Sequence, residues 1–186
     1  PCSTRSRRCC RAARARAGLG RTFQISALAM EDTVQENVLL GAVGALRQEW
    51  RFFGALGQAK DLQDRAADAL ERVGLTAYSD MRCADLSHGL RRQLELGTAL
   101  AREPKVFLMD EPMAGIGPGG SVVLTSILDG LRRQAPILLG EHDMDAVFAL
   151  ADRITVLVGG KVIAHGSVDD IRNDAQVREA YLGDAP

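Results

Sequence analysis

A short apolar run that ends in two adjacent carboxylates constrains this chain more than any other feature. The run is 106–109 (Val-Phe-Leu-Met), and Asp110, Glu111 and Pro112 follow it directly. Such runs are typical of strands buried in a parallel sheet, and the carboxyl ends of these strands carry the ligand-binding residues of open α/β folds. The pattern favours an α/β fold with Asp110 and Glu111 at the functional edge of a sheet. A solvated Asp-Glu turn after a strand is the alternative.

The second half of the chain predicts strands that alternate with helices. We expect strands at 105–110, 137–140, 154–158 and 162–164, and helices at about 121–133, 143–150 and 168–182. The dipeptide Gly159-Gly160 indicates a hairpin turn between the last two strands.

The first half predicts helices only. The spacing Thr33-Val-Gln-Glu36 is a capping box in front of an apolar run, and 59–73 has helical apolar spacing closed by Gly74. A third, amphipathic helix follows Ser87 and ends before Pro104. Together, the two halves predict an α/β protein with a helical subdomain.

The start of the third helix is a second candidate site. Leu86-Ser87-His88-Gly89 places a hydroxyl, a glycine and free backbone N–H groups at a helix N-terminus, which suits an anion. The alternative is that Ser87 acts only as a helix cap.

These pieces occur in an order that resembles the nucleotide-binding domains of ABC transporters, from Arg21 almost to the C-terminus. The matching stretches, in order, are the Q-loop Arg21-Thr-Phe-Gln24, the signature motif Leu86-Ser-His-Gly89, the Walker B end Asp110-Glu111, the D-loop Ala114-Gly-Ile-Gly117 and the switch histidine His142. The stretches 141–144, 151–156, 160–164 and 180–183 further resemble the ATPases of branched-chain amino-acid importers.

The resemblance implies a partial RecA-like ABC ATPase core with an inserted helical subdomain. Its expected parts are an Arg-rich N-terminal segment at 1–20, the α/β core at 21–30 and 104–186, and the helical subdomain at 31–103, ending in the signature helix.

The resemblance also implies ATP and Mg²⁺ as cofactors. Asp110 would hold Mg²⁺, and Glu111 would orient and deprotonate the water that attacks the γ-phosphate. His142 would contact the γ-phosphate as a second catalytic residue. Gln24 would sense Mg²⁺ and the attacking water, and would couple the site to a membrane subunit.

The same resemblance implies the partners. Ser87 and Gly89 would bind the ATP held by a second ABC ATPase subunit in a head-to-tail dimer, and transmembrane permease subunits would complete the transporter. The chain has no stretch of about 18 apolar residues that could span a bilayer. It is therefore expected as a peripheral subunit at the cytoplasmic face of the inner membrane.

One family motif has no counterpart. No G-x-x-x-x-G-K-[ST] sequence occurs, and the only Gly-Lys pair, Gly160-Lys161, lies in the predicted hairpin. That loop cradles the phosphates, so the resemblance predicts that this chain alone neither binds ATP tightly nor hydrolyses it. We interpret the missing loop as a truncation before the Q-loop.

The N-terminal segment is unusual in composition, because 1–20 contains six arginines and no acidic residue. It has neither the apolar region of a signal peptide nor the aromatic residues of a nucleic-acid-binding arm, and we expect no nucleic-acid partner. Its composition suggests a wrong start or a shifted reading frame.

Two alternative functions stay open at this point. In one, the chain is a noncatalytic remnant that still docks on partner subunits. In the other, Gly115-Ile-Gly117-Pro-Gly-Gly120 is the glycine motif of a dinucleotide-binding enzyme, with Glu141 about 20 residues further on. Four residues between Asp110 and Gly115 make that turn longer than the motif requires.

Overall fold

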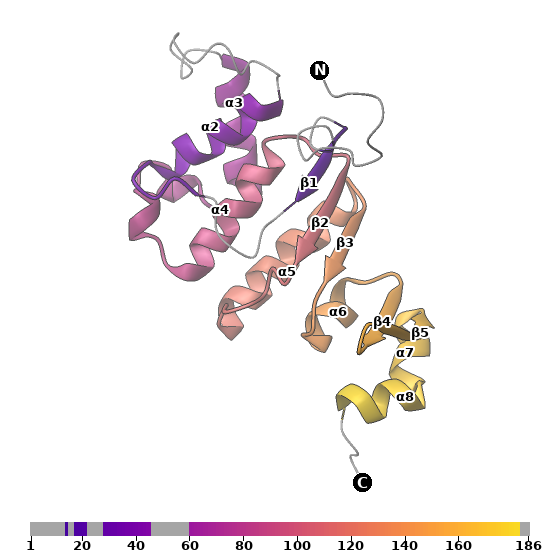
Figure 1. Cartoon of the computed structure of the whole chain (residues 1–186). Coiled ribbons are helices and arrows are strands. Elements are labelled where there is room, and N and C mark those ends of the chain that lie inside the picture. The colour runs from indigo at the N-terminus through magenta and orange to yellow at the C-terminus, as the bar shows by residue number, and fades with distance from the viewer. Residues whose placement is uncertain (1–13, 15–16, 22–27, 46–59, 183–186) are drawn as a thin grey trace. The chain divides into compact units, whose positions relative to one another are not determined.

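A computed structural model of the chain describes residues 14, 17–21, 28–45 and 60–182 (Figure 1). The chain divides into two compact units, 1–140 and 141–186. Helices and parallel strands make up the first unit, and a hairpin with short helices makes up the second, so the described residues have the expected mixture of helix and sheet.

Three packed helices form the helical region of the first unit, and each begins within one residue of its predicted start. They are α2 (Val34–Ala45), α3 (Lys60–Arg72) and α4 (His88–Leu100). The predicted capping box precedes α2, because Thr33 N–H donates to Glu36 Oε2 at 2.8 Å and Glu36 N–H donates to Thr33 Oγ1 at 3.2 Å. Ser87 caps α4 by accepting a hydrogen bond from Leu90 N–H.

Small residues allow these helices to approach closely. A Cβ added to Gly41 of α2 would lie 2.3 Å from the carbonyl oxygen of Thr98 on α4, and one added to Gly97 would lie 3.1 Å from Val73. The helical region has its own apolar core, whose fully buried members include Val34, Val38, Leu62, Val73, Leu75 and Leu94.

A three-stranded parallel sheet forms the rest of the first unit with α5 (Pro118–Arg132). Its strands are β1 (Leu19–Arg21), β2 (Val106–Asp110) and β3 (Ile137–Gly140), in that order across the sheet (Figure 1). The sequence predicted β2 and β3 but not β1. Leu19 and Gly20 pair with Val106 and Phe107, so the sheet begins two residues before the expected start of the core at residue 21.

The two faces of this sheet differ in burial. Phe107 and Met109 of β2 are 2% and 1% exposed, whereas Leu138 of β3 is 66% exposed. Leu138 pairs with Leu108, so both side chains lie on the face opposite to Phe107 and Met109. Only one face of the sheet is fully packed within the described residues.

The second unit contains the predicted hairpin of β4 (Ile154–Val158) and β5 (Lys161–Gly166), which pair antiparallel. The short helices α6 (Met144–Leu150), α7 (Val168–Asn173) and α8 (Ala175–Val177) accompany it, followed by a helical turn at Arg178–Leu182. Its core is Ile154, Val156, Ile171 and Val177. Across the described part of both units, no helix has the length and apolar character needed to cross a membrane.

Candidate functional site

Asp110 and Glu111 lie at the carboxyl end of β2, where the sequence placed them. Asp110 is the last residue of β2 and pairs with Gly140, the last residue of β3. A Cβ added to Gly140 would lie 3.6 Å from Asp110 Oδ1, so the glycine leaves that flank of the carboxylate open. Asp110 is exposed and Glu111 half-buried. The end of β2 thus presents one accessible carboxylate, Asp110, and one partly covered carboxylate, Glu111, beside the glycine that ends β3.

Glu111 has an unusual backbone conformation. Its φ is +46°, in the left-handed region that costs a residue with a side chain about 1–2 kcal/mol. Its N–H donates to the carbonyl oxygen of Gly140 at 2.8 Å, which holds the turn against β3. Among the described non-glycine residues only Glu103, with a φ of +48°, shares this conformation.

The start of α4 lies beside the loop that follows β2. Gly115 has a φ of +73°, and a Cβ added there would lie 3.2 Å from Cε1 of His88. The structure therefore brings the predicted signature and D-loop stretches together. His88 has no predicted role, and its ring lies close to Gly115, a residue far from it in the chain.

His142 and Gln24, the other two predicted site residues, cannot be placed relative to Asp110 and Glu111. His142 belongs to the second unit, where its N–H donates to Glu141 Oε2 at 3.3 Å just before Asp143 caps α6. Gln24 lies outside the described residues.

A magnesium site at Asp110 is compatible with the chemistry of the strand end. Within the described ranges, no three His, Cys, Asp or Glu residues group together as a complete metal cage. Mg²⁺ commonly takes only one or two protein carboxylates and completes its shell with phosphate oxygens and water. An accessible carboxylate at a strand end suits that mode of binding.

Comparison with known proteins identifies the family of the chain. The family model described as "ABC transporter" matches residues 4–114, more than half of the chain. A second model, "Branched-chain amino acid ATP-binding cassette transporter", matches residues 161–186. The first match begins at residue 4, so most of the Arg-rich segment falls within the region similar to the family.

Two curated relatives carry related descriptions. The high-affinity branched-chain amino acid transport ATP-binding protein LivG of Salmonella typhimurium is 37% identical over 181 residues, which cover 92% of this chain and 70% of LivG. BraF of Pseudomonas aeruginosa has the same description and is 33% identical over 180 residues, with 92% and 70% covered.

A solved structure matches the fold. The crystal structure of an ATP-binding cassette of an ABC transporter in its ADP conformation has a TM-score of 0.76 and 29% identity, covering 93% of this chain and 71% of that one. The chain therefore belongs to the ABC transporter family. Within that family it is an ATP-binding subunit, a class of ATPase with a RecA-like α/β core. The dinucleotide-binding alternative is set aside, because residues 111–117 separate β2 from α5 and no tight glycine turn joins them.

Proposed function

We propose that this chain is the ATP-hydrolysing subunit of a transporter that imports branched-chain amino acids. Support for the solute comes from the descriptions of LivG and BraF and from the C-terminal match at 161–186. Other subunits of such a transporter contact the solute, so this part of the proposal needs its own test.

The observation that carries a catalytic function is the backbone of Glu111. A left-handed glutamate at the end of a buried strand costs free energy that glycine or asparagine would avoid. Strained conformations of this kind cluster at active sites, where the geometry serves the reaction. The hydrogen bond to Gly140 fixes the turn, so the carboxylate of Glu111 has a defined starting point at the sheet edge.

The proposed roles follow from the positions at the strand end. Bound ATP would supply the γ-phosphoryl group, and its Mg²⁺ would neutralise part of the phosphate charge. Asp110 would hold Mg²⁺ directly or through water, and Glu111 would accept a proton from the attacking water. His142 and Gln24 would complete the site, His142 at the γ-phosphate and Gln24 at Mg²⁺.

The proposed partners are a second ATPase subunit and transmembrane permease subunits. Ser87 and Gly89 at the exposed start of α4 would bind the ATP of the second subunit, because free N–H groups at a helix N-terminus favour phosphate. With permeases as partners, the chain would work at the cytoplasmic face of the membrane.

Because the sequence has no G-x-x-x-x-G-K-[ST] loop, the test is to express the chain behind a family segment that carries this loop, together with permease subunits. ATP hydrolysis and ATP-driven uptake of leucine, isoleucine and valine are then measured in proteoliposomes. Glu111→Gln should lower the hydrolysis rate about 100-fold or more, because it removes a general base without changing side-chain size. Full hydrolysis in that variant would refute the role of Glu111. Hydrolysis stimulated only by other solutes would refute the solute class.

Glu103→Gln is the matched control. Glu103 has nearly the same backbone conformation as Glu111 but follows α4 and forms an ion pair with Arg65 at 2.8 Å. Its substitution should leave hydrolysis unchanged, so a shared loss of rate would indicate a general effect of removing a strained glutamate.

A further inference from the structure

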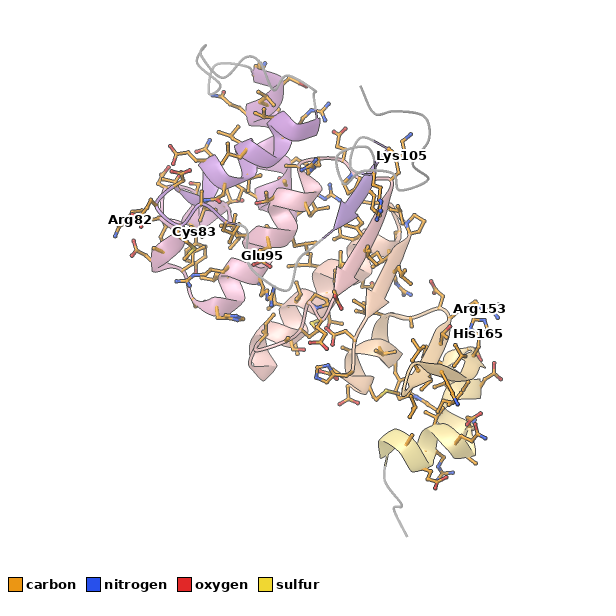
Figure 2. The ribbon with its side chains drawn as sticks, in the orientation of Figure 1. Arg82, Cys83, Glu95, Lys105, Arg153 and His165 are labelled. Atoms are coloured by element: carbon orange, nitrogen blue, oxygen red, sulfur yellow. The ribbon has the colours of Figure 1, made fainter. Side chains whose placement is uncertain are left out.

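Two loops of the helical region are hydrogen-bonded to each other through their backbones. They are residues 28–33, before α2, and residues 79–86, before α4. Cys83, labelled in Figure 2, donates its N–H to the carbonyl oxygen of Asp32 at 2.9 Å. The next residue, Ala84, donates to Met30 at the same distance. We call these two segments the loop pair.

Asn37 clamps the first loop to α2. Its side chain is 3% exposed, yet each of its polar atoms has a partner. Oδ1 accepts from Ala29 N–H at 2.8 Å, and Nδ2 donates to the carbonyl oxygens of Ala29 and Thr33, both at 2.9 Å. A buried amide with this set of bonds fixes the backbone of residue 29 relative to the helix.

Arg91 clamps the second loop to α4. Its Nε donates to the carbonyl oxygen of Cys83 at 3.2 Å, and its Nη2 donates to that of Ala84 at 2.6 Å. The planar guanidinium thus holds two successive carbonyl groups in the turn that leads into Ser87. Lysine could supply the charge at this position but not the forked geometry.

We propose that Asn37 and Arg91 are positioning residues for the ATPase site, which hold the loop pair and the start of α4 as one rigid unit. Through this unit, Ser87 is fixed relative to Ala29, five residues after Gln24. The proposal rests on the proposed function, because it takes Ser87 as an ATP ligand. It adds that two residues without contact to nucleotide set the position of that ligand.

The first test is backbone hydrogen exchange in the full chain. Asn37→Asp keeps the size of the side chain but cannot donate to the two carbonyl groups. It should speed exchange of the Cys83 and Ala84 amides about tenfold, although Asn37 touches neither. Arg91→Lys should likewise speed exchange of the distant Ala29 amide. The amides of α3 should keep their rates.

Arg82→Lys is the matched control for Arg91→Lys, because it makes the same change of side chain and keeps the charge. Arg82 lies in the same turn, but its guanidinium donates to the carboxylate of Asp85 at the surface. It should leave exchange at Ala29 unchanged. If each clamp variant speeds exchange only at the amides next to it, the two residues do not form one unit and the proposal is wrong.

The second test measures ATP hydrolysis in the assembled transporter. Arg91→Lys and Asn37→Asp should raise the KM for MgATP about fivefold or more while kcat changes less, because both disturb ligand position and not the attacking water. If exchange becomes faster at the distant amides but the KM for MgATP stays unchanged, the positioning role is refuted. No hydrolysis by the unsubstituted chain with the phosphate-binding loop restored would refute the proposed function, and the exchange result would still decide whether the unit exists.

Discussion

The helical region and the sheet of the first unit differ in how completely they bury their apolar side chains. The helices at 34–100 enclose their own core, in which Val34, Leu62 and Leu94 have essentially no exposed surface. The sheet buries Phe107 and Met109 on one face but leaves Leu138 of β3 largely exposed on the other. The helical region therefore buries apolar side chains between its own helices, whereas the sheet buries only one of its two faces within the described residues.

The largest effect should come from the helical core. Leu94→Ala should lower the free energy of unfolding by about 2–5 kcal/mol, because it leaves a cavity among fully buried side chains. Leu138→Ala, the same change at a side chain that is 66% exposed, should cost less than about 0.5 kcal/mol. Urea denaturation of both variants tests this. Equal losses would mean that the open face of the sheet is packed in solution.

A second contrast concerns two helical glycines. Gly41→Ala should cost about 1–3 kcal/mol, because its Cβ would press on the carbonyl oxygen of Thr98 and push α2 from α4. Gly130→Ala in α5 meets no atom within 4 Å and should stabilise the chain by about 0.5–1 kcal/mol through helix propensity. Thermal melts would show shifts of opposite sign. A loss at both positions would contradict the close crossing of α2 and α4.

The third contrast separates strain from chemistry at the sheet edge. Glu111→Gly and Glu103→Gly should each raise stability by about 1 kcal/mol, because glycine adopts a φ near +46° without penalty. Only Glu111→Gly should also abolish ATP hydrolysis by the assembled transporter. A stability gain at Glu103 alone would show that the backbone of Glu111 is compensated by its surroundings.

The smallest effect should appear in the pH dependence of the helical region. Hydrogen bonds from the backbone and side chain of Thr33 hold the pKa of Glu36 below its ordinary value of 4.5. A lowered folded pKa gives stabilisation that is complete above that ordinary value and is lost as the pH falls through the lowered pKa. Because the pair is exposed, the loss should be below about 1 kcal/mol.

Glu36→Gln should remove this loss. Denaturation between about pH 5 and about pH 3 should therefore show a shallower decline in the variant than in the unsubstituted chain. Glu71→Gln, at an exposed carboxylate of α3, is the control. The same shallower decline in both variants would mean that general charge, and not the cap, governs the acid response.

Local signals predicted much of the fold. The capping box at Thr33 and Glu36 marked the start of α2, and Gly159 and Gly160 marked a hairpin in which both have the positive φ that such turns require. β1 was not predicted, because it has only three residues, one of them glycine, and no apolar periodicity. Pairing with β2, a partner distant in sequence, defines it as a strand.

The candidate site, like the fold, could be predicted from the sequence only in part. An apolar run ending in acids was enough to place Asp110 and Glu111 at a strand end. The left-handed backbone of Glu111 has no sequence signal, since that conformation normally indicates glycine or asparagine. The proximity of His88 to Gly115 and the hydrogen bonds of Arg91 depend on how distant segments pack, which sequence periodicity does not predict.

Cys83 gives the loop pair a chemical property of its own. Its thiol is completely buried with Sγ 3.7 Å from Sδ of Met30, and burial raises the pKa of the thiol, so the reactive thiolate is scarce in the closed state. Alkylation of Cys83 must therefore wait for the loops to separate. With Cys2, Cys9 and Cys10 replaced by serine, its rate of alkylation reports how often the two loops separate, without any cysteine introduced for the purpose.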